Sequence, residues 1–325
     1  WTDMRPFVGN GPFRLVEWRE QRHLEVERNP HYWDADRVRL KGIRFHPAES
    51  TQAQELAFRA GQLHTTWDVP LAKVAAYRRD SPELLRVEPY FESYFIRFNT
   101  RHPVLRDARV RRALALAVDR VAITRDVLRG GQAAAASLTP PGLGGYTPPA
   151  AVPHDPAAAR SLLAAAGFPG GQGLGPLELS TISSEINQSI AETLQAMWRR
   201  ELGLEVRITR KEFKVLLNSL DTLDYALARG RWIAEYPDPL TYLSIFTTGN
   251  GVNGTGFSDP VYDELVASAA RAPSAAARFE VLRRAESHLM EQVPVAPIYW
   301  GSRATLVAPR VRGWKPSPLG FRNYK

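Results

Sequence analysis

Cysteine is absent from this chain of 325 residues, and long hydrophobic runs are absent as well. The lack of cysteine excludes disulfides, thiolate metal ligands and a cysteine nucleophile. The longest apolar run covers only 113–118, whereas a membrane-spanning helix needs about 20 apolar residues, so no such helix is predicted. The first residues, WTDMRPFVGNGPF, lack the basic and apolar regions of an export signal. We expect the chain to begin inside a longer protein.

Recognisable catalytic, metal-binding and nucleotide-binding motifs are lacking too. No G-x-S-x-G turn or Walker loop occurs, and the seven histidines form no pair or carboxylate cluster with the spacing of metal ligands. The stretch 249–254, GNGVNG, satisfies G-x-G-x-x-G, but a dinucleotide site needs a strand before it and a helix after it. Here the helix-like run LTYLSIF precedes it and a turn follows, which predicts a flexible loop. The sequence therefore predicts no metal, no cofactor and no enzymatic activity.

The charge balance is basic, with 42 Lys and Arg residues against 34 Asp and Glu residues, a net charge of +8 and a pI near 9.8. Such a balance can indicate a protein that neutralises nucleic-acid phosphates with a basic patch. The basic residues are dispersed, however, and the densest group is interrupted by Asp107 and followed by Asp119, as on a solvated helix face. This group comprises Arg106, Arg109, Arg111 and Arg112. No nucleic-acid partner is expected.

Ordinary globular composition and mixed periodicity predict an α/β protein of more than one lobe. Apolar residues make up 44% of the chain and charged residues 23%, and 325 residues exceed the usual size of one domain. Strand-like runs occur at 13–19, 23–28, 85–91 and 93–99, and helix-like runs at 51–60, 155–166, 185–202 and 274–292. Thr51 and Asp155 are the expected N-caps of the first two helices. Residues 130–156, rich in Gly, Pro and Ala, are predicted to be a long connection with too little apolar bulk to pack.

The segment 224–243, DYALARGRWIAEYPDPLTYL, combines a strand pattern with an unusual set of side chains. The strand ends before Pro237-Asp238-Pro239, and a helix can start at Leu240. Arg229 and Glu235 lie on either side of Trp232, so two opposite charges bracket an aromatic side chain. One interpretation is a surface ion pair beside a core tryptophan. The other is a recognition site for a zwitterion, with Glu235 binding an ammonium group and Arg229 a carboxylate.

Several stretches, in order, resemble the solute-binding proteins of peptide and nickel ABC importers, extracellular solute-binding protein family 5. The most specific is FNTRHPVLRDARVRRALALAVDR at 98–120, an Asn-ended strand followed by a D-x-R-V-R-x-A-L helix. The others are NPHYWD at 29–34, DPAAARSLLAAAGFPGG at 155–171, WIAEYPDP at 232–239, SDPVYDELV at 258–266 and VPVAPIYW at 293–300. Ordered matches spread over nearly the whole chain are more specific than any one of them.

The resemblance implies an α/β, two-lobed type II periplasmic-binding-protein fold of the peptide-binding cluster, here lacking its N-terminal portion. The implied division is a partial lobe I at 1–94, lobe II at 95–298, and a return to lobe I at 299–325. The hinge strands are expected at 93–99 and 295–300. The portion expected to be missing normally supplies the strand-like backbone partner of an extended peptide.

The resemblance also implies a ligand site. Glu235 matches the acidic residue that holds the ligand amine, with Glu in place of the familiar Asp, and Arg229 falls where some members place a cation for the ligand carboxylate. The remaining expected ligand-binding residues are Trp232, Phe213, Asn187 and Asn253. A second cation found in some members falls near Leu220, so that contact is absent here.

The implied function is capture of an oligopeptide or dipeptide outside the cytoplasmic membrane and its delivery to an ABC permease. The expected location is the periplasm or the extracellular face of that membrane, with lipid anchoring left open, and the full-length protein is expected to be a monomer. Within the family, a nickel chelate, an opine or a sugar is an alternative ligand, because the fold does not fix the ligand. A hydrolase with a Ser or Thr nucleophile is a third reading, and the lack of a recognisable nucleophile motif with a nearby His counts against it.

Overall fold

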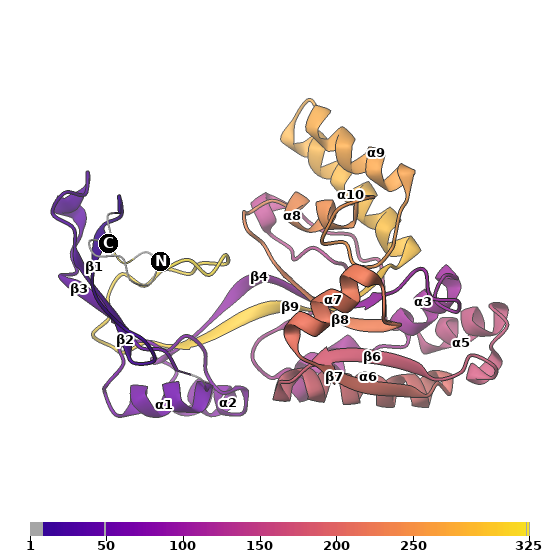
Figure 1. Ribbon diagram of the computed structural model, residues 1–325, viewed down its shortest axis with the longest axis horizontal. Coiled ribbons are helices and arrows are strands. Elements are labelled where there is room, and N and C mark those ends of the chain that lie inside the picture. The colour runs from indigo at the N-terminus through magenta and orange to yellow at the C-terminus, as the bar shows by residue number, and fades with distance from the viewer. Residues whose placement is uncertain (1–8, 49, 323, 325) are drawn as a thin grey trace.

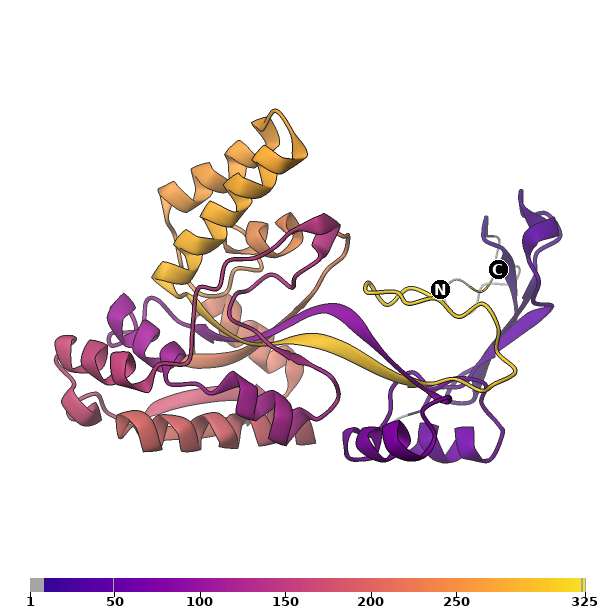
Figure 2. The ribbon, with the colours of Figure 1, turned by 180° about the vertical axis from the view of Figure 1, so that it is seen from behind.

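The computed structural model describes residues 9–48, 50–322 and 324 and consists of two lobes of unequal size. Two long antiparallel strands, β4 (Leu85–Phe98) and β9 (Val295–Leu306), run from one lobe into the other (Figure 1). The view from behind in Figure 2 shows these two strands passing side by side between the lobes. The predicted two-lobed α/β architecture is therefore confirmed. Among the described residues, no helix is long and apolar enough to cross a membrane.

The remaining strands and helices alternate along the chain. The strands are β1 (Phe13–Arg19), β2 (His23–Arg28), β3 (Gly42–Phe45), β5 (Ala133–Ala134), β6 (Leu177–Ile182), β7 (Val206–Lys211) and β8 (Leu227–Ile233). The helices are α1 (Thr51–Arg59), α2 (Leu71–Asp80), α3 (Ala108–Leu116), α4 (Arg120–Ala122), α5 (Pro156–Ala165), α6 (Glu185–Leu202), α7 (Phe213–Thr222), α8 (Leu240–Leu243), α9 (Pro260–Ser268) and α10 (Ala275–Gln292).

The larger lobe is built on a six-stranded mixed sheet in the order β5-β9-β4-β8-β6-β7. Strands β8, β6 and β7 are parallel, while β4 runs antiparallel to both of its neighbours. The connection through α6 leads from β6 outward to β7, and the connection through α7 leads back past β6 to β8. Because such crossovers are right-handed, these two connections place their helices on opposite faces of the sheet, as Figure 1 shows. The main hydrophobic core fills both faces, with Trp198, Phe95 and Tyr262 fully buried.

The smaller lobe contains the sheet β1-β2-β3, helices α1 and α2, and the outer halves of β4 and β9. Its core is a second cluster that includes Phe58, Val74 and Leu306. The final segment packs on the same lobe, because the indole N–H of Trp314 donates to Glu88 at 2.6 Å. The three-stranded sheet leaves apolar side chains uncovered, among them Trp18 at 48% exposure. The boundaries at 94 and 298 fall inside the two shared strands and stay a prediction.

The segment 130–156 differs from its prediction, because it packs into the core of the larger lobe. Leu143, Tyr146 and Val152 are all 1% exposed or less. The Tyr146 hydroxyl donates to the carboxylate of Glu286 at 2.7 Å, and that carboxylate also accepts the backbone N–H of Thr139 at 2.7 Å. The expectation of too little apolar bulk was wrong, since a few large side chains spaced between glycines and prolines suffice to anchor a long loop.

Two smaller expectations also need correction. Helix α1 is capped by Ser50, whose hydroxyl accepts the N–H of Ala53, and Thr51 is already the first helical residue. Arg111 does not lie on a solvated face, because it is 4% exposed and donates to the backbone carbonyls of Gln292 and Val293, among others. The carbonyls at the end of α10 that have no partner within the helix accept hydrogen bonds from the Arg111 guanidinium. One residue of a run of arginines can therefore belong to the core.

Candidate functional site

The carboxyl ends of β6, β7 and β8 meet at the edge of the larger lobe that faces the smaller one. Helices α6 and α7 begin at this edge, since each follows one of these strands directly. The two helices follow the neighbouring strands β6 and β7 and leave the sheet on opposite faces, which makes the carboxyl edge between these two strands a topological switch point. Ligands of open α/β sheets bind outside the carboxyl ends of the strands at such a point. The fold therefore locates the candidate site at this edge.

Arg229 and Asn187, two of the residues singled out from the sequence, are brought together by Tyr94. The Tyr94 hydroxyl donates to Asn187 Oδ1 at 3.1 Å, and the Arg229 guanidinium carbon lies 5.5 Å from the centre of the Tyr94 ring. Tyr94 in turn stacks on Tyr299, with ring centres 5.0 Å apart. Burial raises the pKa of Tyr94 and the charge of Arg229 opposes this rise. Within the described chain, Arg229 Nε has no hydrogen-bond partner, so its donor capacity is not fully used.

Glu235 follows the end of β8 and presents an exposed carboxylate. Its Oε2 accepts the hydroxyl of Thr241 at 2.5 Å, and Thr241 is itself 2% exposed at the start of α8. Considering residues 9–48, 50–322 and 324, no ion pair joins Glu235 to Arg229. The first interpretation, a surface ion pair between these two residues, is therefore not what the structure contains. The carboxylate is held in place by one neutral hydroxyl, and no cation in the described part of the chain pairs with it.

Trp232 lies on the opposite face of β8 from Arg229. The register pairs Trp232 with Ser93 and Arg229 with Ile96, and side chains alternate between the faces along each strand. Trp232 is partly buried against the main core, and neither its indole N–H nor the Ser93 hydroxyl has a hydrogen-bond partner among the described residues. The strand therefore offers Arg229 on one side and Trp232 on the other, with Glu235 beyond its end.

Phe213 and Asn253, the remaining residues expected from the sequence, have contrasting environments. Phe213 begins α7 and is 49% exposed at the same edge of the sheet. Asn253 is buried within its own loop, where its amide donates to the carbonyl of Phe257 at 3.1 Å and accepts the N–H of Thr255 at 3.1 Å. Its amide is thus engaged in shaping the loop. Its assignment as a ligand contact stays a prediction.

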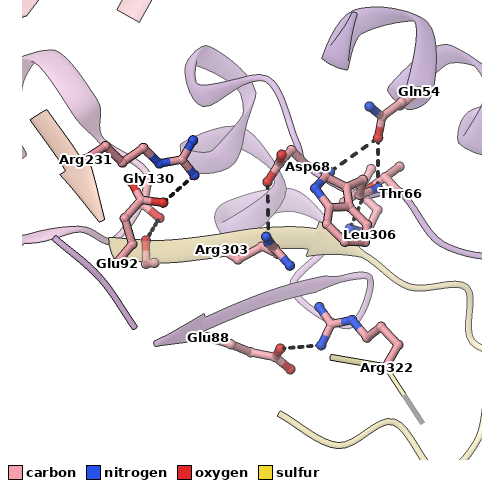
Figure 3. A network of polar contacts seen from close by, with 12 residues as sticks. Gln54, Thr66, Asp68, Glu88, Glu92, Gly130, Arg231, Arg303, Leu306 and Arg322 are labelled. Carbon is pink, nitrogen blue, oxygen red and sulfur yellow. Dashed lines mark hydrogen bonds and ion pairs between the residues drawn. The ribbon is translucent and has the colours of Figure 1, made fainter. Parts of the chain in front are cut away.

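Between the lobes lies a polar network that sequence reasoning missed (Figure 3). Glu92, 7% exposed, binds Arg231 at 2.6 Å and accepts the hydroxyl of Tyr299 at 3.4 Å. Nearby, Arg303 lies 4.0 Å from Asp68. These residues come from four separate segments, and only Arg231 and Tyr299 lie in stretches that the sequence patterns single out. Only the pairing of β4 with β8 and β9 brings them together.

A second unpredicted group lies in the smaller lobe. Glu17, His23 and Glu25 place one ligand atom each within 4.8 Å of one another, which is close enough to hold a metal ion. The expectation that no histidine has carboxylates at ligand spacing was wrong, because the β1–β2 register puts Glu17 opposite Glu25. Both carboxylates already bind arginines, Glu17 with Arg19 at 2.6 Å and Glu25 with Arg44 at 2.6 Å. The arrangement is accounted for by ion pairing within β1 and between β2 and β3.

A known protein family matches most of this chain. Residues 1–254 match the family described as bacterial extracellular solute-binding proteins, family 5 middle, which is more than half of the chain. The chain belongs to this family. The resemblance drawn from the sequence is thereby confirmed.

Individual relatives match almost the entire chain. The periplasmic murein peptide-binding protein MppA of Escherichia coli (strain K12) is 32% identical over 97% of this chain and 59% of its own length. The oligopeptide-binding protein OppA of Bacillus subtilis (strain 168) is 29% identical over 90% of this chain and 56% of its own length. YgiS of Escherichia coli (strain K12), named a probable deoxycholate-binding periplasmic protein, is 30% identical over 97% of this chain and 59% of its own length.

A solved structure of Escherichia coli MppA, a murein tripeptide binding protein, has a TM-score of 0.84 at 31% identity and matches 98% of this chain and 63% of its own. The two-lobed fold of periplasmic peptide-binding proteins is thereby confirmed. The chain spans between 56% and 59% of the length of the three curated relatives.

Proposed function

We propose that the protein carrying this chain is a solute-binding protein that captures a peptide and makes or breaks no covalent bond. The observation that supports this most strongly is the pair of incompletely used charges on and just after β8, Arg229 and Glu235. Glu235 is exposed with a neutral hydroxyl as its contact, and Arg229 Nε has no partner among the described residues. A peptide ligand supplies one group of each opposite sign, an ammonium and a carboxylate.

In this proposal Glu235 binds the ligand ammonium and Arg229 binds the carboxylate. Asn187 belongs to the same part of the site as Arg229. Its Oδ1 accepts the Tyr94 hydroxyl, and the Arg229 guanidinium packs against the Tyr94 ring. Trp232 and Phe213 supply apolar walls that accept varied side chains, and Asn253 shapes the neighbouring loop. Family membership supports this arrangement, because MppA and OppA are named as peptide-binding proteins.

The proposed mechanism is closure of two lobes around the ligand. Residues 1–94 and 299–325 form one lobe in this division and residues 95–298 the other, so β4 and β9 act as the hinge. A ligand that contacts both lobes stabilises the closed state by its differential affinity for that state. The closed complex then delivers the solute to an ABC permease outside the cytoplasmic membrane, in the periplasm or at the outer face of that membrane. We propose that the protein acts as a monomer.

A different ligand class is a second candidate, because YgiS is as similar as the peptide-binding relatives and is named for deoxycholate. The two candidates differ in charge. A bile salt carries a carboxylate but no ammonium, and it would leave Glu235 without a partner.

Native mass spectrometry of the protein, expressed from its whole gene and purified without denaturation, tests the proposal. We expect a retained ligand whose fragments are those of a peptide, and its loss from a variant carrying Glu235→Gln. Retention of a sterol-like or sugar-like mass, equally in both proteins, contradicts peptide capture. Conversion of an added peptide to shorter products contradicts the absence of chemistry.

A further inference from the structure

The segment that carries Trp67 and Asp68 is fixed to the hinge strand β9. Thr65 forms a bridge with Val307, and the N–H of Thr66 donates to the carbonyl of Leu306 at 3.0 Å. From the other side, the side-chain oxygen of Gln54 accepts the backbone N–H of Trp67 at 2.8 Å and that of Asp68 at 3.3 Å, as Figure 3 shows. The backbone of these two residues is therefore held on both sides.

The exposed side chain of Trp67 packs against the buried guanidinium of Arg303. Its indole is 57% exposed, yet the guanidinium of Arg303 packs against it at 4.4 Å and against Tyr90 at 4.2 Å. Arg303 is only 8% exposed, and burying a charge is unfavourable unless its contacts compensate. An arginine buried to hold an exposed indole adds little to the core. The stacked guanidinium therefore holds in a fixed position an indole whose surface stays largely open.

Asp68 carries a carboxylate that the rest of the chain leaves poorly compensated. The nearest cation is Arg303, 4.0 Å away, and no described residue donates a hydrogen bond to this carboxylate, whose side chain is 47% exposed. Burial raises the pKa of Asp68, and the charges of Arg303 and Arg231 oppose this only in part. Figure 3 shows Asp68 in the same polar network as Glu92 and Arg231, where the two lobes meet.

We propose that Trp67 and Asp68 form a subsite for a cationic side chain of the ligand, either an alkylammonium or a guanidinium group. An indole face attracts cations, and a carboxylate without donors gains a charge-assisted hydrogen bond from one. The arginines nearby do not make this an anion site. Arg231 is paired with Glu92 at 2.6 Å, and Arg303 is enclosed between two rings. Asp68 is the charged group of this network left open to a ligand.

This subsite rests on the proposed function, so its test measures selectivity between peptides and not binding alone. The protein expressed from its whole gene is titrated calorimetrically with tripeptides that carry lysine or its uncharged analogue norleucine at each position in turn. At one position, lysine is expected to bind about tenfold more tightly than norleucine, the lower end of the range for a hydrogen bond to a charged group. In Asp68→Asn this ratio should fall to about one while the norleucine peptide binds as before.

The matched control is Asp36→Asn, which removes an exposed carboxylate of the same lobe and should leave the ratio unchanged. A second variant, Trp67→Leu, should also reduce the ratio, since the indole contributes to cation binding. An unchanged lysine preference in Asp68→Asn, or a preference for glutamate over norleucine, overturns the subsite while leaving peptide capture intact. Failure of every peptide to bind the parent protein overturns both proposals.

Discussion

Replacement of Glu235 by glutamine tests how the ligand amine is held. The glutamine side chain keeps an oxygen that can accept the Thr241 hydroxyl, so the local fold after β8 should be retained. What the variant loses is the negative charge. We therefore expect the free energy of unfolding of the ligand-free protein to change by less than about 0.5 kcal/mol, as for a surface substitution.

The effect on binding distinguishes a buried ionic contact from a solvated one. If lobe closure excludes water around Glu235 and the ligand ammonium, removing one partner leaves the other charge buried, which typically costs about 3–5 kcal/mol. An ion pair that stays exposed contributes only about 0–1 kcal/mol. The first range corresponds to an affinity loss of a few hundred-fold or more, at about 1.4 kcal/mol per factor of ten.

The assay is calorimetric titration of a peptide and its N-acetylated analogue into the parent protein and into Glu235→Gln. Acetylation should weaken binding to the parent strongly and binding to the variant little, because both changes delete the same interaction. Glu291→Gln, which removes an exposed carboxylate from α10, is the matched control. Equal losses on acetylation in the parent and in Glu235→Gln would refute the assignment of Glu235 to the amine.

Three further predictions concern other parts of the molecule. Arg229→Gln should weaken a peptide with a free carboxylate by at least about tenfold but its amidated analogue far less, and titration of both peptides would contradict this if the losses were equal. Burial raises the pKa of Glu286 to about 7 from 4.5. The protonated carboxyl therefore stabilises the fold fully below pH 4.5, and this stabilisation is lost as the pH rises through 7. Over this pH range the free energy of unfolding, measured in urea, should fall by on the order of 3 kcal/mol in the parent protein and should not fall in this way in Glu286→Gln. An equal dependence of the unfolding free energy on pH in both proteins would disprove the prediction. Arg111→Ala leaves buried carbonyls without donors and should lower the free energy of unfolding by about 3 kcal/mol, whereas the exposed control Arg106→Ala should change it by less than about 0.5 kcal/mol.

Local patterns in the sequence predicted those elements whose boundaries depend on local chemistry. The bounds of β1, β2 and α6 agree with their predicted ranges, and α8 begins at Leu240 after the Pro-Asp-Pro turn. The alternation of β8 also implies that Arg229 and Trp232, three residues apart, lie on opposite faces. That implication is available from the sequence, although the interpretation with Arg229 and Glu235 on either side of Trp232 places all three residues in a single site.

Features that depend on distant segments could not be predicted in this way. The sequence predicts two strand-like runs, 85–91 and 93–99, whereas β4 is one strand that pairs with β9 on both sides of the irregularity between Pro89 and Ser93. The network of Glu92, Asp68 and Arg303 likewise joins residues whose separation in the sequence exceeds any local period. The segment 130–156 looked too poor in apolar residues to pack because its anchors are single residues that bury against distant helices.

The interruption of β4 coincides with the network between the lobes, and the two features have one physical consequence. The β4–β9 register shifts between Pro89 and Ser93, and β8 pairs with β4 only from Glu92 onward. Fewer β4–β9 ladder hydrogen bonds restrain the chain here than on either side, so bending at this point breaks fewer bonds of that ladder. Glu92 itself is tied to Arg231 of the larger lobe. In the closure proposed above, the segment with Trp67 and Asp68 would move together with the outer half of β9, to which it is fixed.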